Sequence, residues 1–258
     1  MINKFILAVK SIKNLHTLFF DYFGLLKGEV VYKLRDGIRI KARAGSTDFA
    51  EIIIIDGDSE YPSKFYPQNK KPIILDIGAH IGAFSLLIAK KLLSKDPVIF
   101  SLEPNSSSFS VLEKNIKLNE FDFIKPFKLG MTAKDGKGFL LVEGNKYDGG
   151  FVSAKKNKLR DCEEILTISL ANFCKANNIA TVDLMKMDIE GSEYDIFKSS
   201  IGFIKKHVKS IFIELHNIDK KNNYSSFKND IVNYGFSVKA EIMGRTLFLI
   251  NDKLNGKI

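Results

Sequence analysis

Cysteine is scarce in this chain of 258 residues, and no apolar run is long enough to span a bilayer. The two cysteines, Cys162 and Cys174, form neither a Cys-x-x-Cys pair nor a cluster with histidine, which argues against structural zinc. So few cysteines favour a reducing compartment, and we expect a cytoplasmic protein. The sequence also contains no internal repeat and no low-complexity tract.

The first 27 residues carry apolar side chains at helical spacing, interrupted by Lys4, Lys10 and Lys13. These lysines break any membrane-spanning run, and no small-residue cleavage site follows that would mark a secretory signal. We expect an accessory helix packed on the main domain. A helix lying at the inner face of the membrane, with its lysines on the opposite side, stays open as an alternative.

The net charge of +9 permits an acidic partner but selects none. A nucleic acid, an anionic glycan or a membrane surface would each fit, and so would a lysine-rich surface without any partner. The length accommodates one α/β domain plus an accessory segment. Nothing in the sequence fixes the oligomeric state.

We divide the chain into an accessory segment, residues 1–70, and a main domain, residues 71–258. Residues 29–32 and 38–42 flank an Asp-Gly turn, which predicts a hairpin after the first helix. Ser46, Thr47 and Asp48 are expected to cap a short piece that runs to Ile55. A polar loop over 56–62 and a linker over 66–71 then lead into the main domain.

From Pro72 onward, short apolar runs alternate with amphipathic segments, which predicts a parallel sheet with helical crossovers. Strands are expected at 72–76, 97–103, 122–129, 138–142, 164–168, 181–188 and 210–214, and helices at 81–94, 105–116, 170–176 and 224–234. A closing hairpin is expected at 236–242 and 246–250. Residues 144–160, rich in glycine and lysine, are interpreted as a mobile loop. The predicted fold is a Rossmann-like α/β domain with a seven-stranded, mostly parallel sheet and an antiparallel terminal hairpin.

The chain is organised around residues 72–82, where a buried strand ends on Asp76 and a turn with Gly78 and Gly82 follows. This turn lacks the Gly-x-Gly-x-x-Gly that brings a pyrophosphate onto a helix N-terminus, which disfavours a nicotinamide dehydrogenase. Glycines there let a ligand approach the backbone. The charge of Asp76 suits a ligand with a cation at that point, such as the amino-acid end of S-adenosylmethionine.

The second strand ends on Glu103, about 25 residues after Asp76. A carboxylate at this tip can accept both hydroxyls of an adenosine ribose. The two acidic strand ends together resemble a class I methyltransferase.

A second acidic cluster lies at residues 186–193, Lys-Met-Asp-Ile-Glu-Gly-Ser-Glu. It places Asp188 at a strand tip and Glu190 in the next loop, before a helix that Ser192 could cap. Carboxylates this close repel one another unless a cation compensates, and Lys186 is the local partner.

The fifth strand ends with Glu214 and His216, whose side chains point to the same side of an extended chain. His216 could act as a general base, or Asp188, Glu214 and His216 could hold a divalent ion. A hydrogen-bonded structural histidine is the third interpretation.

The motifs at 76–85, 103–105, 186–193 and 213–216 together resemble the FkbM family of S-adenosylmethionine-dependent methyltransferases. The resemblance covers most of the chain from about residue 28 and includes Asp48 and Tyr61. It implies O-methylation of a sugar, glycan or related natural-product hydroxyl. It also implies cofactor-binding and catalytic positions: Asp76, Gly78, Ala79, Gly82, Glu103, Pro104 and Asp188 for the cofactor, and Asp188, Glu190 and His216 for catalysis.

Two positions depart from the family pattern. His80 stands where a smaller polar residue such as Asn is common, and the third strand lacks an acidic residue aimed at adenine.

Two alternative functions compete with an O-methyltransferase. A nucleic-acid methyltransferase would fit the positive charge, but three acids facing a phosphodiester disfavour it. A non-catalytic binding module with a methyltransferase fold is disfavoured by the intact acidic positions. Metal dependence and the acceptor stay open.

Overall fold

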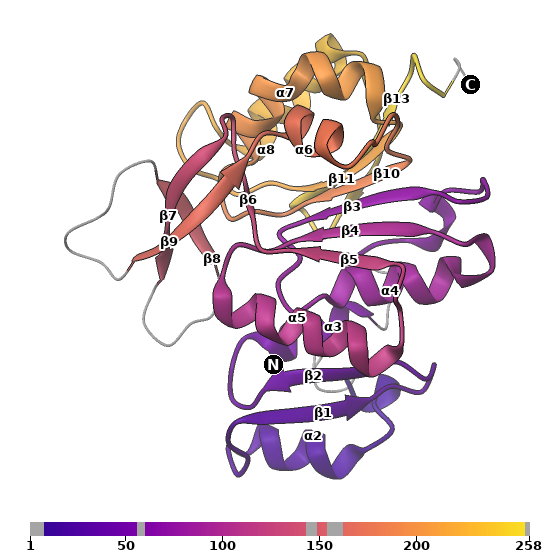
Figure 1. Ribbon diagram of the computed structural model, residues 1–258, viewed down its shortest axis with the longest axis vertical. Helices are drawn as coiled ribbons and strands as arrows, with labels where there is room; N and C mark the ends of the chain where they lie inside the picture. Colours follow the sequence, from indigo (N-terminus) through magenta and orange to yellow (C-terminus); the bar gives the residue numbers. More distant parts are fainter. Residues whose placement is uncertain (1–7, 56–59, 143–148, 154–161, 256–258) are drawn as a thin grey trace.

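A seven-stranded sheet forms the centre of the computed structural model, which describes residues 8–55, 60–142, 149–153 and 162–255 (Figure 1). The strand order is β12-β13-β11-β10-β3-β4-β5. The strands are β3 (Ile73–Ile77), β4 (Val98–Leu102), β5 (Ile124–Phe127), β10 (Leu184–Met187), β11 (Ser210–Glu214), β12 (Phe236–Ile242) and β13 (Thr246–Asn251). The first five run parallel, whereas β13 pairs antiparallel with β11 and with β12. The predicted seven-stranded, mostly parallel sheet with its terminal hairpin is confirmed.

Helices cover both faces of this sheet (Figure 1). They are α4 (Ala83–Leu92) and α5 (Ser106–Asn119) on one face, and α6 (Leu170–Ala176), α7 (Glu193–His207) and α8 (Tyr224–Ile231) on the other. Because strand side chains alternate, Ile74 packs in the core with Leu112, whereas Leu75 packs in a second core with Phe173. Asn105 caps α5 as predicted, accepting a hydrogen bond from the Ser108 amide.

The N-terminal segment packs on the face of α4 and α5. It contains α2 (Leu15–Tyr22), the predicted hairpin β1 (Glu29–Lys33) and β2 (Arg39–Arg43), and α3 (Asp48–Ile55). The prediction of a single helix over the first 27 residues is wrong. Residues 8–11 are helical, but Ile12 then bridges to Leu34 and Asn14 precedes a separate helix. Ile12 and Tyr32 share the buried core of Ile74, so this segment has no core of its own among the described residues.

The connection into the main sheet is more buried than its composition suggests. Tyr61 and Tyr66 are 2% and 5% exposed, and the Tyr66 hydroxyl donates to the Tyr61 carbonyl at 2.7 Å. The burial of these two tyrosines contradicts the predicted polar loop and linker. Each ring gains stability by packing against the main domain instead of facing solvent. Residues 56–59 lie outside the described residues. The division at residue 70 stays a prediction.

A four-stranded sheet of its own was not expected. It has the order β6-β9-β7-β8 and comprises β6 (Gly130–Met131), β7 (Gly136–Val142), β8 (Gly149–Ser153) and β9 (Cys162–Ile168). The prediction of a loop over 144–160 is wrong at β8, and its remaining residues lie outside the described part. No helix that the structure describes is long and apolar enough to cross a membrane.

Candidate active site

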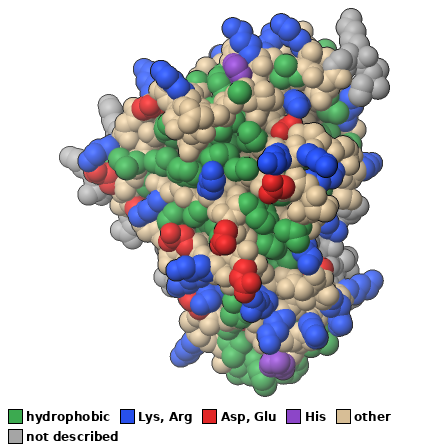
Figure 2. Space-filling view, turned by 45° about the vertical axis from the view of Figure 1, so that its right-hand side comes forward, with side chains coloured by type: hydrophobic (Ala, Val, Ile, Leu, Met, Phe, Trp, Pro, Cys, Tyr) green, Lys and Arg blue, Asp and Glu red, His purple; other side chains and the backbone are tan. Residues whose placement is uncertain are grey.

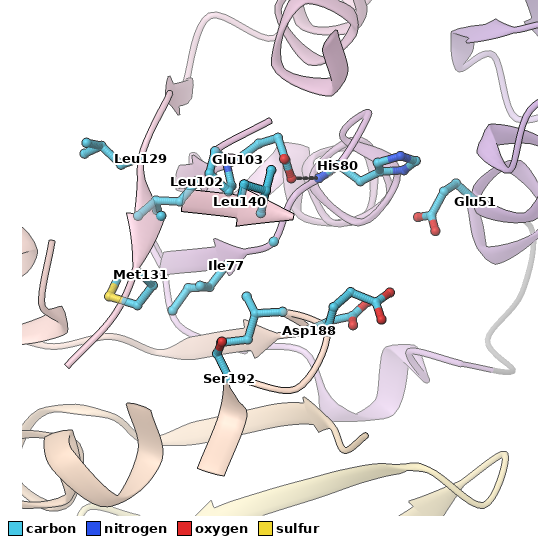
Figure 3. A pocket seen from close by; sticks show the side chains of 15 residues that line it. Glu51, Ile77, His80, Leu102, Glu103, Leu129, Met131, Leu140, Asp188 and Ser192 are labelled. Atoms are coloured by element: carbon cyan, nitrogen blue, oxygen red, sulfur yellow. Dashed lines mark hydrogen bonds between the residues drawn. The ribbon is translucent and has the colours of Figure 1, made fainter. Parts of the chain in front are cut away.

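A pocket lies where β3, β4 and β10 end, with the second sheet as one wall (Figure 3). Its empty space is about 730 Å³, a volume that includes the open mouth. The lining residues are Glu51, Ile77, Gly78, His80, Leu102, Glu103, Pro104, Leu129, Gly130, Met131, Leu140, Asp188, Ile189, Glu190 and Ser192. The predicted positions Gly78, Glu103, Pro104, Asp188 and Glu190 therefore share one pocket.

The turn after β3 is held tightly against the tip of β10. A Cβ on Gly78 would lie 1.8 Å from the Asp188 carbonyl oxygen, and Gly78 has a φ of +79°. A Cβ on Gly82 would meet a Leu112 methyl group at 2.6 Å. The sequence predicts that these glycines admit a ligand, but in the structure both admit other parts of the same chain. Ala79, also predicted at the cofactor, is buried and donates its amide to Leu102.

His80 adopts a left-handed backbone conformation, with a φ of +50°. Asn, Asp and His are the non-glycine residues most often found there, so His can occupy a position where Asn is common. Its main-chain amide donates to Glu103 Oε2 at 2.8 Å. Its Nε2 lies 3.5 Å from Asp48 and 3.3 Å from Arg43, which form a buried ion pair. The accessory segment therefore contacts the turn after β3 through Asp48 and Arg43.

Glu103 follows β4 and is only 5% exposed. Its two carboxylate oxygens accept from the His80 and Asn105 amides, each at 2.8 Å, which fixes the carboxylate at the pocket (Figure 3). Burial raises the pKa of Glu103 to about 7, although the two amides act in the opposite direction.

Asp76 does not line the pocket. It lies inside β3 with no exposed surface, and its Oδ2 accepts from the Ser85 hydroxyl at 2.6 Å. Its Oδ1 lies 3.6 Å from Lys186 Nζ. The structure thus places Asp76 beneath the turn, where direct contact with a ligand in the pocket would need a rearrangement. Burial raises its pKa, and Lys186 and Ser85 oppose that shift.

Lys186 is the buried cation that joins the turn to the β10 tip. Nζ donates to the Gly78 carbonyl at 2.7 Å and lies 3.5 Å from Asp188 Oδ2. Burial alone would lower the pKa of Lys186, but Asp188 and Asp76 outweigh it and raise the pKa above its ordinary value. The predicted compensation by Lys186 is confirmed for Asp188, whereas Glu190 and Glu193 lie beside His216.

Beyond Asp188 the chain turns sharply. Glu190 has a φ of +52°, a strained conformation for a side chain of its size, and Gly191 follows at +106°. The Ser192 side chain makes no capping bond to α7. Glu193 satisfies this turn instead, accepting from the Ile189 and Gly191 amides at 3.0–3.1 Å.

The carboxylate that lies nearest His216 is that of Glu193, not that of Asp188 or Glu214 as expected. Its Nδ1 lies 2.9 Å from the fully buried Glu193, and its Nε2 lies 3.4 Å from Glu190 and 3.7 Å from Glu214. Among the described residues, the side chains whose potential ligand atoms lie close enough together to hold a metal ion are those of Asp188, Glu193 and His216, without Glu214. Glu193 already accepts main-chain and imidazole hydrogen bonds, so this donor set does not favour a metal, and the expected Asp188–Glu214–His216 site is corrected.

Two further carboxylates, Glu51 and Glu214, interact electrostatically with Asp188, and Glu60 acts on both of them. Glu51 of α3 lines the pocket, while Glu60 and Glu214 both lie near Arg245, at 3.9 Å and 3.0 Å. Burial, and then Asp188, raises the pKa of Glu214. Burial raises the pKa of Glu51 to about 8, and Asp188 and Glu60 add to that shift against Lys186. We name Glu51, Glu60, Asp188, Glu190 and Glu214 the acidic crevice.

The sequence profile of the methyltransferase FkbM domain matches residues 76–237, more than half of the chain. The chain belongs to the FkbM methyltransferase family. This match contains the turn after β3, Glu103, Asp188 and His216. The predicted resemblance is confirmed, whereas the roles of individual residues rest on the geometry above.

Similar proteins agree with this FkbM assignment. "Methyltransferase 1" of Beauveria bassiana is 24% identical over 65% of this chain and 73% of its own length. "Methyltransferase sdnD" of Sordaria araneosa is 24% identical over 55% of this chain and 66% of its own length. A solved FkbM methyltransferase from Methylobacillus flagellatus superposes with a TM-score of 0.51 at 15% identity, covering 75% of this chain and 47% of that one. The chain therefore spans about half of that solved relative. The superposition supports the fold alone.

The stability of this FkbM domain is expected to fall as the pH rises from 5.5 to 8.5. Glu103 keeps its proton up to a pKa of about 7 when folded but loses it near 4.5 when unfolded. Between these values the folded state binds more protons, so the free energy of unfolding decreases with pH, by about 2 kcal/mol from Glu103 alone. His216, whose pKa the Glu193 carboxylate raises against the effect of burial, acts in the same direction from pH 6.5 upward.

Urea unfolding of the wild type and of Glu103→Gln at pH 5.5, 7.0 and 8.5 measures this slope. The difference in slope between the two proteins isolates Glu103. Equal slopes would show that Glu103 is ionised in the folded protein throughout this range.

Proposed function

We propose that this FkbM methyltransferase uses S-adenosylmethionine to methylate a hydroxyl of a sugar, a glycan or a related natural product. The observation that carries the proposal is the pairing of two carboxylates across one pocket. Glu103 is fixed by two main-chain amides on one wall, and Asp188 lies at the β10 tip on the facing wall. One is suited to hold a donor and the other to serve the reacting hydroxyl.

The residues present fit S-adenosylmethionine. Each Glu103 oxygen accepts one amide and keeps a lone pair for a ribose hydroxyl, the arrangement that a diol requires. Leu102, Leu129, Met131 and Leu140 gather at one end of the pocket, where an adenine ring would pack against apolar surface (Figure 3). Asp188 and Glu51 lie at the other end, where the Asp188 carboxylate would stabilise a cationic amino-acid or sulfonium group.

When bound, S-adenosylmethionine would supply an electrophilic methyl group on a positively charged sulfur, and that sulfur would become a neutral thioether as the acceptor oxygen takes the methyl group. The chain must align the acceptor and take up its proton. Asp188, which is partly exposed in the pocket, is our proposed proton acceptor.

His216 suits a different task. Its raised pKa means that the imidazolium form persists at neutral pH, so it is a weak base in the ligand-free protein. Both ring nitrogens face carboxylates, Nδ1 facing Glu193 and Nε2 facing Glu190. We propose that His216 positions the strained loop of Glu190 and that it carries positive charge beside the acceptor.

The acidic crevice selects among acceptors. The Asp188 and Glu190 carboxylates, which line the pocket, would repel a phosphodiester, and this disfavours the nucleic-acid alternative. They would accept hydrogen bonds from several hydroxyls at once, as a polyhydroxylated acceptor offers. We therefore favour an uncharged or cationic sugar-like acceptor over nucleic acid.

A transfer assay tests this proposal. The protein is incubated with methyl-labelled S-adenosylmethionine and, in separate arms, with neutral glycosides, amino sugars, hydroxylated natural products and RNA. We expect label in an alkali-stable methyl ether, and little transfer by Asp188→Asn, which preserves the side-chain shape. Label in RNA alone would contradict a sugar, glycan or natural-product acceptor, and label in an alkali-labile ester would contradict a hydroxyl acceptor. Cofactor binding with no transfer in any arm would favour the binding-module alternative.

A further inference from the structure

The outer face of α2 and the turn after it carry an unusual concentration of exposed apolar side chains. Eleven large apolar residues are exposed in the part of the chain that the structure describes, and six of them fall between positions 15 and 25. These six, which we name the α2 patch, are Leu15, Phe19, Phe20, Tyr22, Phe23 and Leu25. Isolated exposed apolar residues are ordinary, whereas a concentration of this kind marks an interaction surface.

The aromatic members of the α2 patch contact one another. The Phe19 ring lies 4.5 Å from the Phe23 ring and 5.9 Å from the Phe20 ring, and Tyr22 lies 5.4 Å from Phe23. These side chains remain 42–57% exposed despite their mutual contacts. The patch is therefore one continuous aromatic surface.

The opposite face of α2 is anchored to the domain. Leu18 is 1% exposed, and the largely buried Asp21 accepts from the Tyr32 hydroxyl and from the Gly45 amide. Asn14, just before the helix, bonds to the Val31 carbonyl and to the Lys33 amide. The patch is thus held in place by β1 and β2 and needs no folding step to form.

Positive charges predominate around the α2 patch. Between residues 8 and 28 the exposed ionic side chains are Lys10, Lys13 and Lys27, because Asp21 is buried. Across residues 8–45 there are eight Lys and Arg residues against three Asp and Glu. In Figure 2, Lys and Arg side chains surround apolar ones at the lower end of the molecule, where Figure 1 shows α2.

We propose that the α2 patch docks the protein on a membrane surface rich in anionic lipid. Aromatic rings insert at the headgroup boundary, and each flanking lysine is attracted to the negative surface. A second copy of the chain fits this patch less well, because a two-fold contact would bring Lys10, Lys13 and Lys27 toward the same lysines of the other copy. The docking does not depend on the proposed methyl transfer.

Sedimentation with vesicles tests this docking. The full chain is mixed with vesicles of phosphatidylcholine alone or with about one-third phosphatidylglycerol. We expect binding to the anionic vesicles, at least tenfold weaker binding to neutral ones, and loss of binding in high salt. Replacing Lys10, Lys13 and Lys27 by Gln should weaken binding about 100-fold, since each lysine near such a surface contributes about fivefold.

The apolar contribution of the α2 patch is tested by Phe19→Ser combined with Phe23→Ser. This double variant should bind the anionic vesicles about tenfold more weakly, or weaker still. Matched controls change equally exposed residues elsewhere. Val232→Ser with Met243→Ser controls for lost apolar surface, and Lys175, Lys205 and Lys206 replaced by Gln control for lost charge. Circular dichroism verifies that every variant is folded.

Three outcomes would overturn the proposal. Equal binding to neutral and anionic vesicles would remove the electrostatic part, and equal loss in the control variants would remove the specific surface. Absence of vesicle binding, together with a dimer in sedimentation velocity that the Phe19/Phe23 variant dissociates, would assign the α2 patch to a second copy.

Discussion

Replacing Lys186 by Met is expected to lower the free energy of unfolding by about 3–5 kcal/mol. Removing one partner of a buried ion pair leaves the other charge uncompensated. Here the remaining carboxylate, Asp76, has no exposed surface, and the Gly78 carbonyl loses its donor as well. Urea or guanidinium unfolding at pH 7 measures the change.

A second variant separates this electrostatic effect from lost packing. Lys186→Met combined with Asp76→Asn removes the orphaned charge, so it should recover a large part of the lost stability. Lys209→Met is the control, because Lys209 pairs with Asp183 at 2.7 Å on the same sheet but is 37% exposed. It should cost about 1 kcal/mol or less. A double variant as unstable as Lys186→Met alone would contradict an electrostatic role for Lys186.

Gly78→Ala is expected to destabilise the protein by about 3–5 kcal/mol. The new Cβ would lie 1.8 Å from the Asp188 carbonyl oxygen, which belongs to the backbone and cannot rotate away. The φ of +79° adds strain for any side chain. If the variant folds, the tip of β10 must move away from the turn, and cofactor affinity should fall with stability.

Gly202→Ala is the matched control for that change. Gly202 lies in α7, has no positive φ, and has no atom within 4 Å of the point that an alanine Cβ would occupy. Alanine there should stabilise the helix by about 0.5–1 kcal/mol. Equal effects of the two substitutions in chemical denaturation would show that contact between the turn and β10 does not determine stability.

The local patterns of the main sheet were predictable because each element carries its own signal. The Asn105 cap was predicted correctly, and the run at 72–76 corresponds to β3, although Asp76 lies inside that strand rather than at its tip. The same patterns did not reveal two contacts. Gly78 lies against the Asp188 carbonyl as well as lining the pocket, and Glu193 rather than Ser192 satisfies the amides of the turn before α7. A sequence shows that a turn needs glycine but not which atom lies across from it.

The residues that sequence reasoning missed come from distant segments. Glu51, Glu60 and Arg245 meet Asp188 and Glu214 only after α3 and the closing hairpin fold over the strand tips. No local periodicity encodes such a meeting. The one available signal was the recurrence of isolated acids beside apolar runs, at Glu51 next to 52–55 and at Glu60 next to Tyr61. Two strands of the small second sheet were predicted, at 138–142 and 164–168, but their pairing with each other in a separate sheet was not.

The central claim is that Glu103 holds the ribose of S-adenosylmethionine in this pocket, and calorimetric titration tests it most directly. We expect micromolar binding of S-adenosylmethionine and S-adenosylhomocysteine to the purified protein. Glu103→Ala should weaken binding of both more than about 100-fold, from two ribose hydrogen bonds of roughly 1.5–3 kcal/mol each. Glu113→Ala, an exposed position on α5, should leave it unchanged. Absence of binding to either ligand, or undiminished affinity in a folded Glu103→Ala protein, would contradict the account.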